Sequence, residues 1–301
     1  MNIQWKRIFA FGLILIIALS GCNYPGWKES PAYEYPTPGI TETGVFILPG
    51  GTPEPGQTSI PPTNTSSTPV AKPTAGTTQG TSGNLKRSGP DVVATRLEKS
   101  PVIDGSLDDW STTKNDAGSV VFGAENWSGK NDLSGWFMLG WDDAYLYLGV
   151  QVTDDQYVEN ETGSKLYRGD SLEILFDSDL TGDFYVNTKS PDDFQLGISP
   201  GNPEPGQNIE AYLWSPSQVA GERPQVITAA TKTETGYQVE TAIPWHVFEA
   251  KPAAGHIYGF VFSISDNDNP NENVQQTMIS NDPKRVLDDP TTWGNLLLAN
   301  Q

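Results

Sequence analysis

The chain of 301 residues carries 18 basic and 37 acidic residues, a net charge of −19, and a single cysteine. Six of the basic and four of the acidic residues precede residue 91, so residues 91–301 alone carry a net charge of −21. A domain this acidic repels phosphate backbones and anionic lipid surfaces, which argues against a nucleic-acid partner. One cysteine cannot form an intrachain disulfide, so the hydrophobic core and any bound metal must stabilise the fold.

The first 22 residues have the pattern of a secretory signal. Lys6 and Arg7 precede an apolar run over residues 8–19, which is short for a membrane span and ends in Leu-Ser-Gly before Cys22. This end resembles the lipobox of bacterial lipoproteins, which implies that Cys22 becomes the lipidated first residue. The alternative is a cysteine packed at the end of an uncleaved anchor. We expect a secreted, lipid-anchored protein at the cell surface or on a periplasm-facing membrane.

Residues 23–90 are rich in Pro, Thr, Ser and Gly. Such a composition buries too little apolar area to offset the entropy of ordering, and its prolines favour extended conformations. The sequence therefore predicts a disordered linker over residues 23–90 and one folded domain over residues 91–301.

Short runs of β-branched and aromatic residues recur beyond residue 91, separated by clusters of Gly, Asn, Asp and Pro. In residues 145–152 and 171–176, apolar residues alternate with other residues, the period of a strand with one face in a core. No stretch has a sustained helical period, and residues 244–248 form at most one helical turn. We predict an all-β antiparallel sandwich, with further strands at 136–141, 194–198, 209–214, 226–231, 237–243, 257–265 and 275–279.

Five short motifs occur in one order: IDGSLDDW (103–110), WDDAYLYLGVQVTDD (141–155), YRGDSLEILFDSD (167–179), GYQVETAIPW (236–245) and WGNLLL (293–298). Together they resemble the family 9 carbohydrate-binding modules of secreted polysaccharide-degrading systems, over residues 92–299. The resemblance implies a β-sandwich that binds sugar without cleaving it, with Trp110, Trp141 and Trp245 in the core. It also implies carbohydrate as the partner and a possible glycoside hydrolase nearby.

The resemblance implies a sugar held between two aromatic side chains. Tyr167 occupies the first position, whereas the second holds Leu287, with Trp293 six residues later as the candidate replacement. Gln195 stands where the family often has arginine, which exchanges a fork of donors for one amide. Arg168 is a candidate for the missing cation and equally an exposed turn residue.

Glu173 has the opposite strand parity to Leu172 and Ile174, so its carboxylate leaves the core face. A carboxylate there can accept two hydroxyl hydrogen bonds from one sugar, and Glu173 matches the ligand-binding acid of the family. The alternative is an ordinary solvated charge on the sheet surface.

The segment 177–183 places oxygen-bearing side chains at every second position, with Gly182 at the sixth. Such spacing suits a hard cation such as Ca²⁺, and the resemblance implies structural calcium. Thr188 stands where an EF-hand has glutamate, so the loop is not an EF-hand; the alternative is a hydrophilic turn. The predicted ligands are Asp177, Asp179, Thr181 and Asp183, with residues 266–268 as a second candidate.

We expect no catalytic activity because the resemblance implies binding alone, while 33 acidic residues in residues 91–301 make a search for a glycosidase pair uninformative. His246 and His256 lie ten residues apart, outside common zinc spacings. One alternative is a haem-binding redox domain of a related sandwich, for which Met138, Met278 and the two histidines are the candidate ligands. Another is a structural or adhesion module that binds no sugar.

Lipidation of Cys22 makes a testable prediction. Cys22→Ser should give an uncleaved or misrouted precursor that takes up no labelled fatty acid, because the thiol that accepts the lipid is gone. Metabolic labelling of both chains measures this, and equal labelling of the variant would rule the assignment out.

Overall fold

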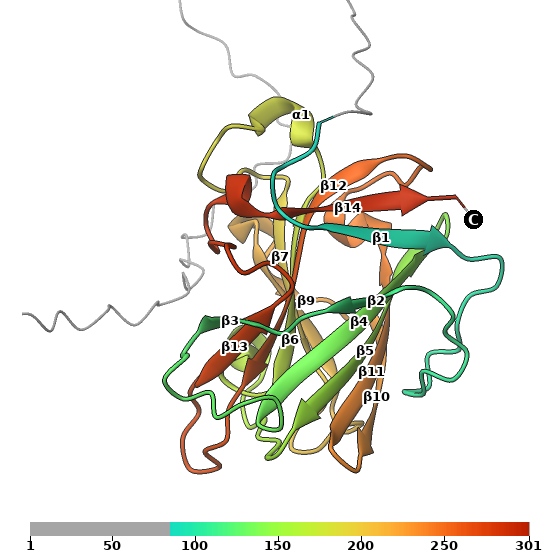
Figure 1. Cartoon of the computed structure of the whole chain (residues 1–301). Coiled ribbons are helices and arrows are strands. Elements are labelled where there is room, and N and C mark those ends of the chain that lie inside the picture. The colour runs from blue at the N-terminus through green and yellow to red at the C-terminus, as the bar shows by residue number, and fades with distance from the viewer. Residues whose placement is uncertain (1–84, 301) are drawn as a thin grey trace, which may run out of the picture. The chain divides into compact units, whose positions relative to one another are not determined.

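The computed structural model describes residues 85–300 (Figure 1). The predicted signal with Cys22, and the predicted linker as far as residue 84, lie outside these residues. The elements are β1 (Asp91–Arg96), β2 (Lys114–Asp116), β3 (Ser119–Phe122), β4 (Leu133–Trp141), β5 (Tyr145–Asp154), η2 (Gly163–Arg168), β6 (Ser171–Asp177), α1 (Leu180–Asp183), β7 (Asp193–Ser199), β8 (Glu210–Ser215), η3 (Ser217–Val219), β9 (Gly221–Glu222), β10 (Ile227–Thr233), β11 (Gly236–Pro244), η4 (Trp245–Phe248), β12 (Ile257–Asp266), β13 (Thr277–Ser280), η5 (Pro290–Thr292) and β14 (Gly294–Ala299).

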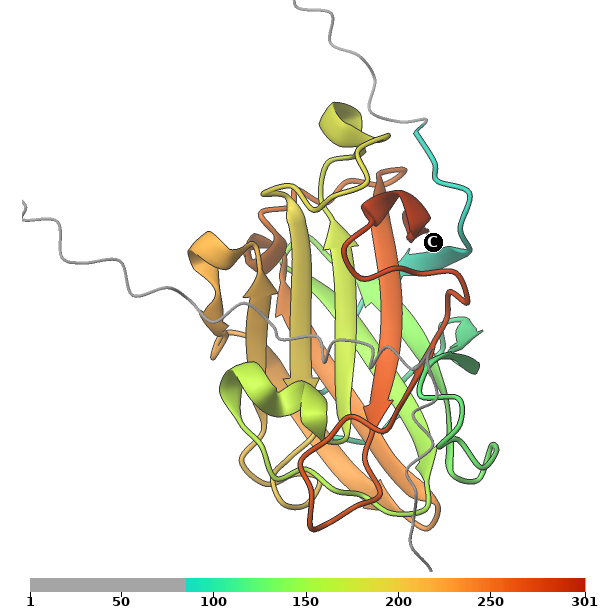
Figure 2. The same ribbon diagram turned by 90° about the vertical axis from the view of Figure 1, so that its left-hand side faces the viewer.

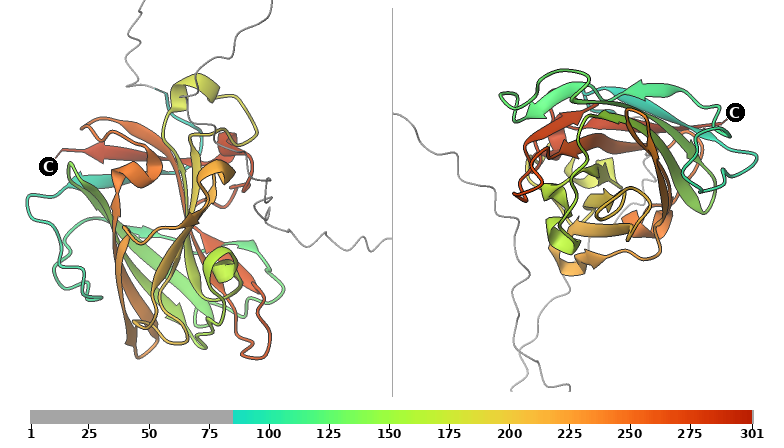
Figure 3. Two further views of the ribbon diagram at one scale, coloured as in Figure 1. Left: turned by 180° about the vertical axis from the view of Figure 1, so that it is seen from behind. Right: turned by 90° about the horizontal axis from the view of Figure 1, so that it is seen from below.

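The strands form one curled, 14-stranded sheet (Figures 1 and 3). Its main path follows the order β10-β11-β5-β4-β1-β14-β12-β6-β7-β8-β9, and β2, β3 and β13 lie off this path. β2 pairs with β4, and β13 pairs with β12 and β3. The sheet curls so that the half ending in β4 faces the half beginning at β14, and both halves contribute to one apolar core. This arrangement confirms the predicted β-sandwich.

β1 joins the two halves of the sandwich and departs from the predicted antiparallel pattern. It runs parallel to β14, from Asp91 opposite Asn295 to Thr95 opposite Ala299, and parallel to β4 at Thr95 and Arg96. The strand alternation in the sequence carries no information about the direction of a partner strand. The remaining pairings are antiparallel.

The core confirms the predicted strand faces. Leu146, Leu148, Val150 and Val152 of β5 are fully buried, as are Leu172, Ile174 and Phe176 of β6, and all belong to the same cluster. The halves meet through aromatic rings, with Phe137 of β4 centred 4.6 Å from Phe262 of β12. Burial of this many aromatic and aliphatic side chains is the main source of stability in such a domain.

The predicted packing role of the tryptophans is confirmed for Trp141 and Trp245, which are buried, whereas Trp110 is half-buried. Trp110 lies over β5, where a Cβ on Gly149 would come within 2.9 Å of the indole. Buried Glu240 of β11 accepts hydrogen bonds from Trp110 Nε1 at 2.7 Å and from the backbone of Asp104 and Gly105 at 2.9 and 2.7 Å. One carboxylate thereby fastens the segment 103–110 onto the sheet.

The folded domain begins before the predicted boundary at residue 91. Arg87 is buried; its backbone N–H donates to Asn295 Oδ1 at 2.8 Å, and its guanidinium forms an ion pair with Asp177 at 2.6 Å. Gly89 lies so close to the backbone of Trp293 and Gly294 that a Cβ would clash at 2.8 Å. The composition of residues 85–90 does not reveal this anchoring, because the anchoring depends on contacts of Arg87 with Asn295 and Asp177, which lie far along the chain.

A second, smaller apolar cluster lies on the outer face of the sheet. Leu175 of β6, Val261 of β12 and Trp293 are fully buried there, with Leu287 packed against them. Trp293 Nε1 donates to the carbonyl of Val286 at 2.9 Å. The indole therefore has no exposed face on which a sugar could stack. Trp293 packs this cluster and does not serve as the predicted sugar platform. Sequence spacing could not reveal that the loop 281–293 folds back over this ring.

The predicted strands agree with the structure to within a few residues, and the predicted helical turn is η4. β1 and β14, of six residues each, are not among the predicted strands. Neither are the short strands β2, β3 and β9, because two to four residues are too few to show an alternation. Within residues 85–300 no helix has the length and apolar character needed to cross a membrane.

Burial of Trp293 predicts that Trp293→Ala lowers the free energy of unfolding by about 3–5 kcal/mol, the usual cost of emptying a large buried aromatic site. Urea unfolding of the purified domain measures this. Tyr185→Ala is the matched control, because that ring is 88% exposed and its removal should change stability little. Equal stability of both variants would contradict the packing role.

Candidate functional site

The outer face of β12, β6 and β7 carries the sequence-predicted acid. Glu173 lies opposite Ser263 of β12 and Gly197 of β7, on the face away from the main core. We call this surface, with Gln195 at its edge, the site face. In Figure 2 these strands face the viewer, with η2 near the bottom and the loop 281–293 beside β12. The predicted parity of Glu173 is therefore correct, but the side chain is buried rather than solvated.

Glu173 is the centre of a polar network. Its Oε1 forms an ion pair and hydrogen bond with Nη2 of Arg285, and its Oε2 accepts from Gln195 Nε2 at 2.7 Å. Lys189 Nζ lies 3.1 Å from Gln195 Oε1 and 3.1 Å from Asp288 Oδ1. The network thus runs Arg285, Glu173, Gln195, Lys189, Asp288. Both oxygens of Glu173 are bonded, so a ligand would share its remaining acceptor capacity with protein donors.

Arg285 and Lys189 are the site residues that sequence reasoning missed. Arg285 belongs to the loop 281–293, more than 100 residues from Glu173, and Lys189 lies in the loop before β7. The one available signal was the adjacent basic pair Lys284–Arg285 in an otherwise acidic domain. Nothing in that pair indicates which strand it would reach.

Tyr167 lies in η2 at the border of the site face and is half-buried. Its ring meets that of Trp214 edge-on at 6.2 Å, and its hydroxyl accepts from Arg168 Nε at 3.2 Å. A Cβ on Gly197 would lie 2.2 Å from Trp214 and 2.9 Å from Leu166, so glycine there lets η2 and the indole pack onto β7. Because Gly197 is the register partner of Glu173, the sequence-predicted aromatic and acid occupy the same face.

The predicted residues are thus only partly brought together. Glu173 and Gln195 are in direct contact, and Tyr167 contacts Arg168. Trp293 is covered by Leu287 and the loop, as described above. The guanidinium that reaches Glu173 belongs to Arg285, whereas Arg168 bonds the hydroxyl of Tyr167.

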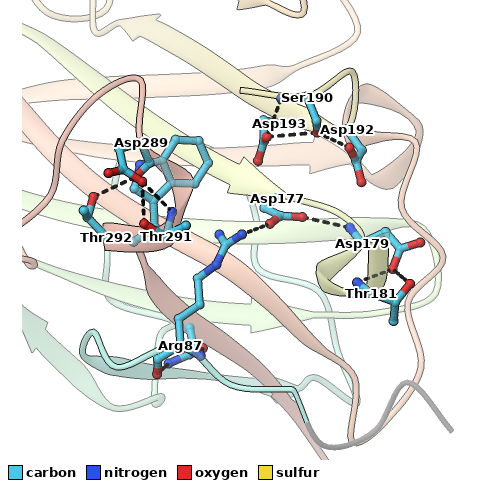
Figure 4. Close-up of polar contacts among 12 residues, drawn as sticks. Arg87, Asp177, Asp179, Thr181, Ser190, Asp192, Asp193, Asp289, Thr291 and Thr292 are labelled. Atoms are coloured by element: carbon cyan, nitrogen blue, oxygen red, sulfur yellow. Dashed lines mark hydrogen bonds and ion pairs between the residues drawn. The ribbon is translucent and has the colours of Figure 1, made fainter. Parts of the chain in front are cut away.

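The predicted metal loop is rearranged in the structure (Figure 4). Asp177 and Asp183 approach within 4.8 Å of each other together with Asp192, which the sequence did not indicate. Asp179 instead caps α1, accepting from Thr181 N at 2.9 Å and Thr181 Oγ1 at 2.6 Å. The predicted ligands Asp179 and Thr181 therefore satisfy each other. The alternation of residues 177–183 breaks because α1 turns the chain.

Arg87 already compensates part of the charge at this loop, since its guanidinium is paired with Asp177. Burial raises the pKa of Asp177 to about 7, with Arg87 opposing the shift. Burial likewise raises the pKa of neighbouring Asp193 to about 6, despite its hydrogen bonds from Ser190.

A second acidic group is more completely buried. Asp154, Asp170 and Asp266 lie within 4.8 Å of one another, and each has one carboxylate oxygen without a hydrogen-bond partner. None of the ion pairs within residues 85–300 includes them. Burial, reinforced by repulsion from nearby carboxylates, raises the pKa of Asp154 to about 7, that of Asp266 to about 9, and that of Asp170 well above its usual range.

A third group comprises Asp132, Asp155 and Asp268. It is more exposed than the second group, to which it is linked through the neighbouring pairs Asp154–Asp155 and Asp266–Asp268. The sequence had indicated residues 266–268 as a second candidate, and the structure places their two carboxylates in different groups. Carboxyl groups gathered in this way can neutralise by taking up protons, as the raised pKa values of the second group indicate, or by sharing a cation.

The two histidines considered as haem ligands belong to none of these groups. Within residues 85–300, the three groups of potential metal ligands consist of aspartates alone. The sulfur of Met278 accepts a hydrogen bond from Arg285 at 3.0 Å, and His256 Nδ1 lies 3.1 Å from the carbonyl of Lys251.

Two proteins named for polysaccharide degradation are similar in sequence to this chain. Endo-1,4-beta-xylanase A of Thermoanaerobacterium saccharolyticum is 29% identical over 224 residues, and exoglucanase XynX of Acetivibrio thermocellus is 31% identical over 224 residues. The matches cover 73% of this chain but only 17% and 18% of those proteins. The chain therefore spans less than a fifth of the length of these relatives.

Two solved structures share the fold. They are a carbohydrate binding module family 9 from Caldicellulosiruptor kristjanssonii in complex with cellotriose and with glucose, both at 24% identity. The matches cover 70% of this chain and 95% and 97% of those chains, with TM-scores of 0.53 and 0.52. The family model described as carbohydrate family 9 binding domain-like matches residues 103–301. With this match across most of its length, the chain belongs to that family of carbohydrate-binding domains.

Proposed function

We propose that the site face binds the end of a neutral oligosaccharide without cleaving it. The observation that carries the proposal is the presence of the buried Glu173 network and the half-buried ring of Tyr167 on one face of the sheet. Aromatic rings stack on the C–H faces of sugars, while carboxylate and guanidinium groups bond their hydroxyls. The C. kristjanssonii module in complex with cellotriose and glucose supports the choice of these sugars as probes.

The site face suits binding better than catalysis. A glycosidase needs one carboxyl group as a proton donor and a second carboxylate across the scissile bond. Glu173 instead has both oxygens engaged by Arg285 and Gln195, and the nearest acid of the network, Asp288, is paired with Lys189. Both carboxylates therefore neutralise cations.

Calcium binding is part of the proposal. Asp154, Asp170 and Asp266 fit a hard cation because each has an unpaired, buried oxygen and the three carboxylates lie within 4.8 Å of one another, and oxygen ligands are those that Ca²⁺ prefers. Asp177, Asp183 and Asp192 form a weaker second site, since Arg87 already neutralises part of its charge. Bound there, the ion supplies charge compensation and cross-links loops; it takes part in no chemistry.

A lipid on Cys22 and a flexible linker would hold this domain at the cell surface. The region that the xylanase and the exoglucanase share with this chain makes up only 17% and 18% of those proteins. We propose that the domain serves a similar accessory purpose, holding polysaccharide near degrading or importing proteins of the same cell, among them a glycoside hydrolase.

Sugar binding should be weak, with a dissociation constant between about a micromolar and about a millimolar, because hydroxyls must exchange well-bonded water for the protein. Calorimetry with cellotriose measures it. Tyr167→Ala removes the stacking ring and Glu173→Gln the charge-assisted bonds, and each should weaken binding by about 1–3 kcal/mol.

The control for both variants is Tyr185→Ala, an exposed ring away from the site face, which should bind as the wild type does. Wild-type affinity in Tyr167→Ala and Glu173→Gln would remove both residues from the site. Absence of binding by the wild type across a glycan array would favour a structural or adhesion role instead.

Calcium binding predicts opposite effects of one substitution. Because the raised pKa values of Asp154 and Asp266 mean that folding disfavours ionised carboxylates, the metal-free domain should lose stability as the pH rises from about 4 towards 9. Asp170→Asn should therefore raise the melting temperature in chelator. The same variant should lose the gain that millimolar Ca²⁺ gives the wild type.

Asp183→Asn is the matched variant at the weaker site and should retain most of that gain. An unchanged wild-type melting temperature with Ca²⁺ and with chelator would show that these aspartates hold no calcium.

A further inference from the structure

The cation of the site face comes from a loop. Arg285 belongs to the segment 281–293, which follows β13, yet its Nη2 bonds Glu173 on β6 and the sulfur of Met278 on β13. Its side chain is 8% exposed. Position 195, on the adjacent strand β7, contributes only an amide. Among the residues at 85–300 that bond Glu173, Arg285 is thus the one that carries a positive charge.

The loop holds Arg285 firmly. The next residue, Val286, has its N–H bonded to Thr292 Oγ1 and its carbonyl bonded to Trp293 Nε1, each at 2.9 Å. On the other side, Asp282 Oδ1 accepts from the backbone of Lys284 at 2.9 Å. Buried Trp293 therefore positions Arg285, which gives the indole a role in the site without contact with a ligand.

The network has hydrogen-bonding capacity left over. Arg285 Nε and the hydroxyl of Ser263, which stands opposite Glu173 in the sheet, are both buried and have no hydrogen-bond partner within residues 85–300. A planar guanidinium beside a carboxylate presents a donor next to an acceptor. Adjacent hydroxyls of a sugar ring match such a pair, since each hydroxyl can both donate and accept.

Charge at the site face favours an uncharged sugar. Glu173 balances Arg285, and Asp288 balances Lys189, so the network sums to zero inside a domain with a net charge of −21. An acidic sugar would have to compete with Glu173 for the same guanidinium and leave one buried carboxylate unpaired. Such an unpaired buried charge costs several kcal/mol.

We propose that Arg285 is the specificity-determining donor of the site, and that with Glu173 it selects neutral sugars carrying adjacent free hydroxyls. The inference rests on the proposed function, which it deepens. The competing explanation is that Arg285 only neutralises Glu173, a purely structural ion pair.

Arg285→Lys separates the two explanations. Lysine keeps the charge that Glu173 needs but replaces the planar fork with a point charge that cannot bond the carboxylate and a sugar hydroxyl in one plane. We expect Arg285→Lys to melt close to the wild-type temperature while its affinity for cellotriose, measured by calorimetry, falls at least about tenfold, the effect of losing one charge-assisted bond. Arg96→Lys is the control, because Arg96 forms a surface ion pair with Asp143 and its side chain is 40% exposed.

A double variant covers the case in which Arg285→Lys is unstable. Glu173→Gln with Arg285→Gln leaves two neutral amides and no unpaired charge, so it should fold and should fail to bind cellotriose. Wild-type affinity in the folded Arg285→Lys protein, or in this double variant, would overturn the role of Arg285 while leaving sugar binding intact.

The ligand class has its own test. The wild type should bind glucose at least about tenfold more tightly than glucuronate at neutral pH, because only the acid sugar must displace Glu173. Equal or tighter binding of glucuronate would overturn the selection of neutral sugars. Absence of wild-type binding to cellotriose and glucose alike would overturn the proposed function itself, and this inference with it.

Discussion

The two-sided burial of β6 is the constraint on which the rest of the structure depends. Its inner face supplies Leu172, Ile174 and Phe176 to the main core, and its outer face presents Glu173 and Leu175. A strand buried on both sides cannot leave an acid unpaired on either of them. Glu173 must therefore meet a cation, and the loop that brings Arg285 to it must be held against the same face by Leu175 and Trp293.

Electrostatics divide the domain into two kinds of site. Aspartates gather in three groups at loops, and the most buried of these has no cationic partner within residues 85–300. The site face, by contrast, pairs each carboxylate with a basic side chain. This contrast separates a group of buried carboxyls without a cationic partner from a face that is already neutral. It is the physical basis for proposing calcium at the former and an uncharged sugar at the latter.

Three segments distant in sequence build the site face. η2 brings Tyr167, β6 and β7 bring Glu173 and Gln195, and the loop 281–293 brings Arg285. Gly197 makes room for the first of these segments, since any side chain there would collide with Trp214. The third segment is anchored by Trp293, so a residue without ligand contact still decides where the guanidinium lies.

The sequence by itself determined most of the longer strands, their buried faces and the family, because strand alternation and short motifs are local properties of the chain. It also placed Glu173 outward, since the direction of a side chain follows from strand parity, whereas its contact with Gln195 comes from the pairing of β6 with β7. Only the tertiary structure decided that β1 runs parallel to its partners, that Asp192 replaces Asp179 beside Asp177, and that Trp293 is buried. It alone brought Arg285 to Glu173, because contacts across more than 100 residues depend on how loops return to the sheet, which no local pattern encodes.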